Sequence, residues 1–204
     1  MVELFSVNEA AAIAEVSPET IRTALEKKSV TPSHKRRTGK AVRHQFSVGD
    51  VLFIKLLVEF PFPLSKQDKH SLAQVLARGN RKASPWSMEG VDLVYRSGDV
   101  QLSMQWKPFR RTVERNLATF RWGRRRVVSS PEVLGGEPVF RGTRVPLRHV
   151  ASLFRKGVSE KEIIEDFPHL SARDLAYARL FSRFGEKPGR PRKRLAFQRG
   201  QRGA

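Results

Sequence analysis

The stretch "SVNEAAAIAEVSPETIRTALEKK", residues 6–28, contains the start signals of two short helices separated by a turn. Ser6 or Asn8 is placed to cap a first helix, whose small apolar residues recur near helical spacing. Ser17 followed by Pro18 is typical of an N-cap and a first helical position. The stretch therefore predicts a helix-turn-helix.

The following residues extend this unit. In the second helix Ile21, Ala24 and Leu25 form a buried stripe, which leaves a polar face outward. Residues 29–46, "SVTPSHKRRTGKAVRHQF", are punctuated by proline and glycine and predict a basic β-hairpin, or wing. A third helix is predicted to begin at Ser47. This order is that of a winged helix-turn-helix, which places its second helix in the major groove of DNA.

Residues 5–57 resemble the DNA-binding domain of MerR-like regulators. The resemblance rests on "FSVNEAAAIAEVSPETIR", on Gly39 with "VRHQFS", and on the "DV" that starts the third helix. Thr23 and Ala24 replace aromatic residues usual in that family, so base preference is not carried over. The residues that we assign to DNA contact are Ser17, Thr20, Arg22, Thr23, Lys27, Lys35, Arg36, Arg37, Lys40 and Arg43.

The charge of the chain also favours a polyanionic partner. Its 204 residues carry 39 Lys and Arg against 20 Asp and Glu, a formal net charge of +19. The excess is concentrated in three basic blocks, at residues 27–44, 107–126 and 185–204. Nucleic acid is the first candidate for such a chain, and a membrane surface is the weaker alternative.

Composition argues against several classes of function. The chain has no cysteine, so disulfides and thiolate metal sites are excluded, and its five histidines lack metal-ligand spacing. No apolar run approaches the roughly 18 residues of a membrane span, and no secretory signal is visible. The acids of residues 160–166 fall on a solvated helical face. We expect a cytoplasmic, non-enzymatic protein without catalytic residue, metal or cofactor.

A second distinctive stretch is "PEVLGGEPVFRGTRVPLRHV", residues 131–150. Its glycines can adopt positive φ and its prolines fix φ, so it predicts a rigid turn. Three helices are expected after it, near 147–156, 159–167 and 171–184. Their predicted core consists of Val150, Leu153, Ile163, Ile164, Phe167, Leu170, Leu175, Ala178 and Leu180.

Residues 127–183 resemble a family of small bacterial domains of unknown function that are encoded beside PIN-like ribonuclease toxins and regarded as their antitoxins. The resemblance rests on the "GGEPVFRGTRVP" motif and on Gly157, Ser159, Phe167, Pro168, Leu170 and Asp174. It implies a PIN-like toxin as partner. The residues assigned to toxin binding or to the turn itself are Gly136, Pro138, Arg141, Gly142, Thr143 and Arg144. In the alternative interpretation the arginines only pair with Glu162, Glu165 or Asp166.

The remaining segments give weaker signals. Residues 60–126 predict a helix beginning after Ser65 and two strands around the turn at 96–99, with a role in packing or dimerisation. The tail, "GEKPGRPRKRLAFQRGQRGA", has little to bury and resembles an AT-hook core. Its basic residues are assigned to DNA or to the acidic cleft of the toxin: Arg190, Arg192, Lys193 and Arg194.

Together these signals predict a mainly α chain with small β elements, of the α+β class. We expect a winged helix-turn-helix at 1–59, a connecting region at 60–126, a trihelical, helix-turn-helix-like domain at 127–184 and a basic tail at 185–204. The predicted function is an antitoxin that silences a PIN-like ribonuclease and, as a homodimer, represses its own operator. The alternatives are a stand-alone MerR-like regulator and an RNA-binding factor.

Overall fold

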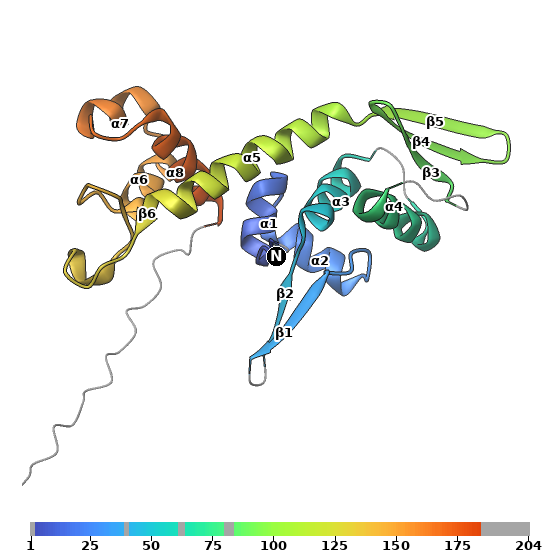
Figure 1. Ribbon diagram of the computed structural model, residues 1–204, viewed down its shortest axis with the longest axis horizontal. Coiled ribbons are helices and arrows are strands. Elements are labelled where there is room, and N and C mark those ends of the chain that lie inside the picture. Colours follow the sequence, from blue (N-terminus) through green and yellow to red (C-terminus); the bar gives the residue numbers. More distant parts are fainter. Residues whose placement is uncertain (1–2, 39–40, 61–63, 80–83, 185–204) are drawn as a thin grey trace, which may run out of the picture.

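A long helix organises the molecule. The computed structural model describes residues 3–38, 41–60, 64–79 and 84–184. Helix α5 (Lys107–Arg126) crosses the molecule, with the C-terminal helices at one end, a three-stranded sheet at the other and the N-terminal helices along its middle (Figure 1). The sheets are small and antiparallel. The α+β class predicted from the sequence is confirmed.

The N-terminal elements follow the winged helix-turn-helix order. They are α1 (Val7–Ala14), α2 (Pro18–Glu26), β1 (His34–Thr38), β2 (Ala41–Gln45) and α3 (Val48–Glu59). Ser6, Ser17 and Ser47 cap the three helices through their hydroxyl groups, because each accepts a hydrogen bond from a backbone N–H of the first turn. The hairpin β1–β2 projects away from the helices (Figure 1).

The middle of the chain forms a helix and a sheet. These elements are α4 (Lys66–Arg78), β3 (Trp86–Glu89), β4 (Asp92–Ser97) and β5 (Val100–Gln105), with strand order β3-β4-β5. Ser65 caps α4, and the tight turn at Gly98 joins β4 to β5, as predicted. The strand β3 was not expected.

Sequence reasoning also missed the longest helix. Helix α5 spans 20 residues of what was interpreted as a basic block in a connecting region. Its buried residues are Val113, Asn116, Leu117, Phe120 and Gly123. They recur three or four residues apart, which is the spacing that indicates an amphipathic helix.

The C-terminal elements confirm the expected trihelical unit. They are β6 (Val127–Val128), the 3₁₀ turn η1 (Leu134–Gly136), β7 (Val139–Phe140), α6 (Leu147–Arg155), α7 (Glu160–Asp166) and α8 (Ala172–Phe184). The predicted core residues are buried or half-buried with one exception: Ile164 is 40% exposed, so its assignment to the core was wrong. The fully buried Ile163 occupies the inward position of this short helix.

One continuous core joins the N-terminal and C-terminal helices. Helix α8 packs against α6, α5 and α1, and α5 also packs against α3. Gly123 of α5 makes this packing close, because a Cβ atom there would lie 2.1 Å from the ring of Tyr177 in α8. Within the described ranges, the structure has no helix with the length and apolar character needed to cross a membrane.

Candidate functional site

The wing is anchored at its base by one carboxylate. Asp50 Oδ2 accepts hydrogen bonds from the Ser33 backbone N–H at 3.0 Å and from the Ser33 hydroxyl at 2.6 Å. The same oxygen accepts the Ser47 N–H at 2.8 Å, which closes the capping box of α3. A backbone bridge between Phe5 and Phe46 holds the second strand at the same base of the hairpin. The wing therefore leaves the body in a fixed direction.

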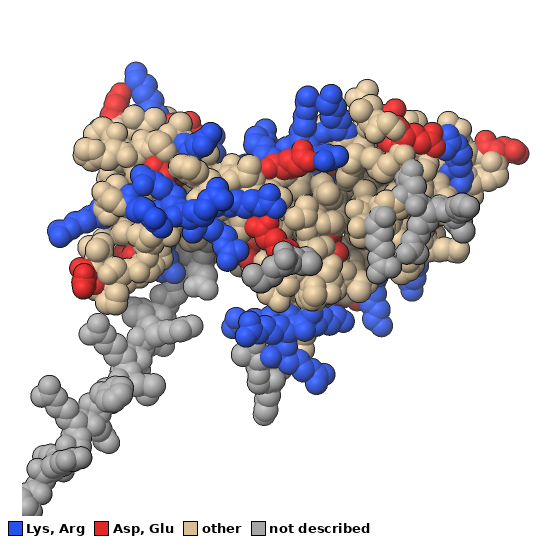
Figure 2. All heavy atoms as spheres, in the orientation of Figure 1, with Lys and Arg blue, Asp and Glu red and all other residues tan. Residues whose placement is uncertain are grey.

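The projecting part of the wing is strongly basic. Lys35, Arg36, Arg37 and Arg43 are exposed, and none of these side chains forms an ion pair with any residue that the structure describes. The antiparallel register places Arg36 directly opposite Arg43. Figure 2 shows the basic side chains gathered on this hairpin. Like charges at opposed positions destabilise an isolated hairpin, so this arrangement favours a polyanionic partner.

Helix α2 carries the other residues that were assigned to DNA contact. Ser17 and Thr20 are engaged in capping, since Ser17 Oγ accepts the Thr20 N–H at 3.0 Å and lies 2.8 Å from Thr20 Oγ1. Arg22 is exposed and donates to Glu19 at 3.2 Å. An exposed pair of this kind is weak, so the guanidinium can exchange Glu19 for a phosphate. Thr23 is half-buried and Lys27 is exposed at the C-cap.

The second motif, residues 131–150, contains a closed turn at residues 140–145. Gly142 adopts φ +77°, a conformation that L side chains rarely take. Thr143 Oγ1 donates to the Phe140 carbonyl at 2.8 Å and accepts the Val145 N–H at 3.1 Å. The hydroxyl of Thr143 is thus used inside the turn, and the flanking arginines remain as its outward groups.

The rest of the motif frames this turn. Gly136 adopts φ +89°, as expected, and the Pro138 carbonyl accepts the Leu147 N–H at 3.0 Å. Val139 pairs with Val128 and also bridges to Pro146. Both ends of the turn are therefore held by backbone hydrogen bonds before α6 begins.

Arg126 connects the turn to helix α8 by hydrogen bonds. Its Nε donates to Asp174 Oδ1 at 3.0 Å, and its Nη1 donates to the Arg141 carbonyl at 2.6 Å. Asp174 is fully buried, and its carboxylate also accepts the Ser171 N–H and hydroxyl. Burial raises the pKa of Asp174, but the bonds from Arg126 and Ser171 outweigh it and lower that pKa below its ordinary value.

Arg141 and Arg144, which flank Gly142 and Thr143 in the turn, are exposed. Neither side chain forms an ion pair within the described part of the chain, so the proposed pairing with Glu162, Glu165 or Asp166 is absent there. Glu162 instead closes the capping box of α7 with Ser159. Two arginines are thus presented without a neutralising carboxylate.

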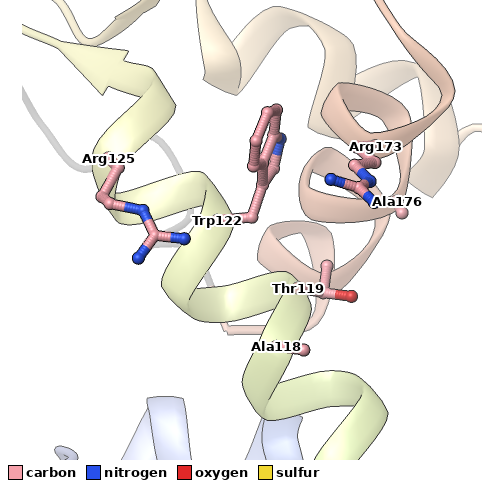
Figure 3. A pocket seen from close by; sticks show the side chains of 6 residues that line it. All are labelled: Ala118, Thr119, Trp122, Arg125, Arg173 and Ala176. Atoms are coloured by element: carbon pink, nitrogen blue, oxygen red, sulfur yellow. The ribbon is translucent and has the colours of Figure 1, made fainter.

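A pocket of about 310 Å³ lies between α5 and α8 (Figure 3). Trp122, Arg125 and Arg173 line it, and the Arg173 guanidinium lies 5.2 Å from the centroid of the Trp122 ring. The indole Nε1–H of Trp122 is buried and has no acceptor among the residues that the structure describes. The pocket is therefore rich in hydrogen-bond donors, which suits a carboxylate or phosphate. Arg125 and Arg173 were not assigned from the sequence, because they meet only through helix packing.

Three further kinds of side chain remain to be considered: tryptophans, possible metal ligands and the other assigned basic residues. Trp86 and Trp106 are buried and pack in the core. In the described ranges, no three His, Cys, Asp or Glu side chains are grouped to hold a metal ion. Lys40 of the wing and the assigned tail residues Arg190, Arg192, Lys193 and Arg194 lie outside the described residues.

Comparison with known proteins finds a family match in the C-terminal part of the chain. Residues 127–181 match the family described as "Protein of unknown function (DUF433)". The uncharacterized protein y4eO of Sinorhizobium fredii (strain NBRC 101917 / NGR234) is 36% identical over 91 residues, which are 45% of this chain and 41% of y4eO. The chain thus matches less than half the length of that relative.

The comparison with solved structures gives a weak match. The X-ray crystal structure of Rv2018 from Mycobacterium tuberculosis matches 87% of this chain and 97% of its own. The sequence identity is 15% and the TM-score is 0.35.

Proposed function

We propose that the chain binds double-stranded DNA through α2 and the β1–β2 wing and represses the operator of its own gene. The observation that carries this proposal is the register of the wing, which opposes Arg36 and Arg43 on an exposed hairpin without carboxylates to neutralise them. A row of phosphates relieves that repulsion and releases counterions. The capped helix α2, with Arg22 on its exposed face, supplies the second contact.

The salt dependence of DNA affinity tests this half of the proposal. We compare Arg36→Ala/Arg43→Ala with Lys156→Ala/Lys161→Ala, which removes two exposed charges from the C-terminal part of the chain. For the wing variant, the slope of log affinity against log salt becomes shallower by about 0.9 per lost phosphate contact. The control variant keeps the slope of the native chain. Equal slopes for all three proteins contradict DNA binding by the wing.

We infer that the C-terminal module neutralises a PIN-like ribonuclease. The proposal is supported by the DUF433 match and by the two exposed arginines on the braced turn. Preorganised guanidinium groups lose little entropy when they bind carboxylates, and PIN-like nucleases cluster carboxylates around their metal. The pocket lined by Trp122, Arg125 and Arg173 adds donors for acidic side chains of the same partner.

Purification of the tagged chain from its host, after nuclease treatment, tests for this partner. We expect mass spectrometry to identify a stoichiometric PIN-like protein whose ribonuclease activity the chain inhibits. Recovery of the chain alone both with and without nuclease treatment favours the stand-alone MerR-like regulator. A complex that is recovered only when ribonuclease is omitted favours the RNA-binding factor.

Two sets of variants separate the modules. Arg141→Ala/Arg144→Ala lowers toxin inhibition and keeps DNA affinity, because neither side chain supports the turn by an ion pair within the described chain. Charge reversal at Arg190, Arg192 and Arg194 assigns the tail by the activity that it reduces. A turn variant that inhibits the toxin as well as the native chain contradicts the assigned role.

A further inference from the structure

The three-stranded sheet has one open edge. Strand β5 pairs with β4 along its whole length and has no strand on its other side within the described residues. The opposite edge strand β3 packs against α4, where the Tyr95 hydroxyl of β4 reaches Asp68 at 3.4 Å. Figure 1 shows β5 at the far end of the molecule, away from the wing and the C-terminal helices. Its outer N–H and C=O groups are therefore available to another strand.

The apolar face of the sheet continues to this open edge. On β3 and β4 this face is covered, because Trp86 is 2% exposed and Leu93 is 1% exposed. The register carries the same face outward from Tyr95 to Leu102 on β5. There Leu102 is 41% exposed and Val100 is 53% exposed. The sheet thus ends with apolar side chains that the described chain covers only in part.

Strand β5 also lacks the features that protect an edge from pairing. Natural edge strands carry lysine, other charges, proline or a bulge. The sequence of β5 is VQLSMQ, which has no charged residue and no proline. Its pairing with β4 runs through six consecutive residue pairs without a bulge. The edge is consequently suited to strand addition.

The three-stranded sheet differs in charge from the rest of the chain, which bears on the partner that can approach it. Residues 86–105 contain Glu89, Asp92 and Asp99 against Arg96, a formal charge of −2 in a chain of +19. Two copies of such a basic chain repel each other over most of their surfaces. At this sheet the basic charge is outnumbered by acidic residues, so the repulsion between basic surfaces is reduced and a second copy can approach here.

We propose that two copies of this chain form a dimer by antiparallel pairing of their β5 strands, which makes one six-stranded sheet. A two-fold axis perpendicular to the sheet keeps each apolar face on the same side. With the axis at Leu102, that residue lies opposite Leu102 of the second copy, and Val100 lies opposite Met104. The uncovered apolar side chains then cover one another across the new edge, and this assembly requires neither DNA nor toxin.

The mass of the chain in solution tests the proposal. We expect light scattering after size-exclusion chromatography to give about twice the chain mass of 23.2 kDa. Leu102→Lys places two ammonium groups opposite each other and yields a monomer with unchanged circular dichroism. The control Val91→Lys, at a 60% exposed position outside β5, remains a dimer. A monomeric native chain at about 100 µM, or a dimeric Leu102→Lys variant, overturns the proposal.

A cross-linking experiment keeps the test decisive if Leu102→Lys fails to fold. Because the chain has no cysteine, Leu102→Cys introduces one thiol per copy. Directly opposed residues of antiparallel strands have Cβ atoms about 4.5–5.5 Å apart, within reach of a disulfide after a small adjustment. Mild oxidation should convert most Leu102→Cys chains to a covalent dimer and leave Val91→Cys chains monomeric in a denaturing gel. Equal cross-linking of both variants contradicts the pairing.

Discussion

Arg126 and Asp174 lie 48 residues apart in the sequence, and their side chains form an ion pair with a distance of 3.0 Å from Nε to Oδ1. Arg126 is the last residue of α5, and Asp174 lies in the first turn of α8. Because Arg126 also donates to the Arg141 carbonyl, one guanidinium connects the two helices to the arginine-bearing turn. The position of this turn therefore depends on the packing of α5 against α8.

Replacement of Arg126 by Gln should lower the free energy of unfolding by about 2–3 kcal/mol. Removing one partner of a fully buried pair costs about 3–5 kcal/mol, and the cost is smaller here because water reaches part of the Arg126 side chain. Urea denaturation measures the change. The matched control is Arg125→Gln, at an exposed neighbouring position, which should alter stability by less than about 0.5 kcal/mol. Equal effects of the two variants contradict the bracing role.

The lowered pKa of Asp174 predicts a dependence of stability on pH. The folded chain holds this carboxyl below its ordinary pKa of 3.8, so the unfolded chain binds its proton more tightly. The contribution to stability is complete above the ordinary pKa and is lost as the pH falls through the lowered value. The stability difference between the native chain and Asp174→Asn should be constant near pH 6–8 and narrow below about pH 4. A difference that is independent of pH down to about pH 2 argues against the ion pair.

Two glycine-to-alanine substitutions should change stability in opposite directions. At Gly123 an added Cβ would meet the Tyr177 ring at 2.1 Å and force α5 away from α8, with a loss of about 1–3 kcal/mol or more. At Gly49 of α3 the nearest atom would be Ala77 Cα at 3.5 Å, an ordinary contact, and alanine should add about 0.5–1 kcal/mol through its helix propensity. Thermal unfolding measures both changes. Destabilisation by both variants contradicts the assigned packing.

Local sequence signals predicted most helices and failed for the longest one. Ser17, Ser47 and Ser65 each form the cap that their positions predicted. Helix α5 begins at Lys107, and its N-cap residue Trp106 makes no side-chain capping bond, so the usual start signal is missing. The number of arginines in this segment predicted a basic block. The apolar residues between them also follow helical spacing, which was not considered in that prediction.

In the candidate sites, too, local features were predicted from the sequence and long-range contacts were not. The positive φ at Gly135 and Gly136 follows from the residue type, and these conformations were predicted. The pairing of Arg126 with Asp174, and the pocket that Arg125 shares with Arg173, depend on two helices distant in the sequence. Such long-range contacts require tertiary packing, which single-sequence patterns do not specify.

Glu15 connects the N-terminal helix-turn-helix to the rest of the chain. It ends α1 in the left-handed conformation at φ 57°, two residues before the cap of α2. Its carboxylate Oε1 accepts hydrogen bonds from Asn116 of α5 and Arg183 of α8, each at 3.2 Å. The turn that orients α2 is therefore held by both helices.

Replacement of Glu15 by Asn should weaken operator binding by about three- to tenfold, which corresponds to roughly 0.7–1.4 kcal/mol. Asparagine tolerates the left-handed conformation, so the variant removes the long-range hydrogen bonds without straining the backbone. Fluorescence anisotropy with operator DNA measures the affinity, and Glu132→Ala, at an exposed position in the C-terminal part, controls for the loss of one negative charge. If Glu15 acted only through charge, its removal from a DNA-binding domain would strengthen binding. A gain in affinity for Glu15→Asn would therefore contradict a positioning role, whereas a loss indicates that the packing of α5 and α8 sets the orientation of α2.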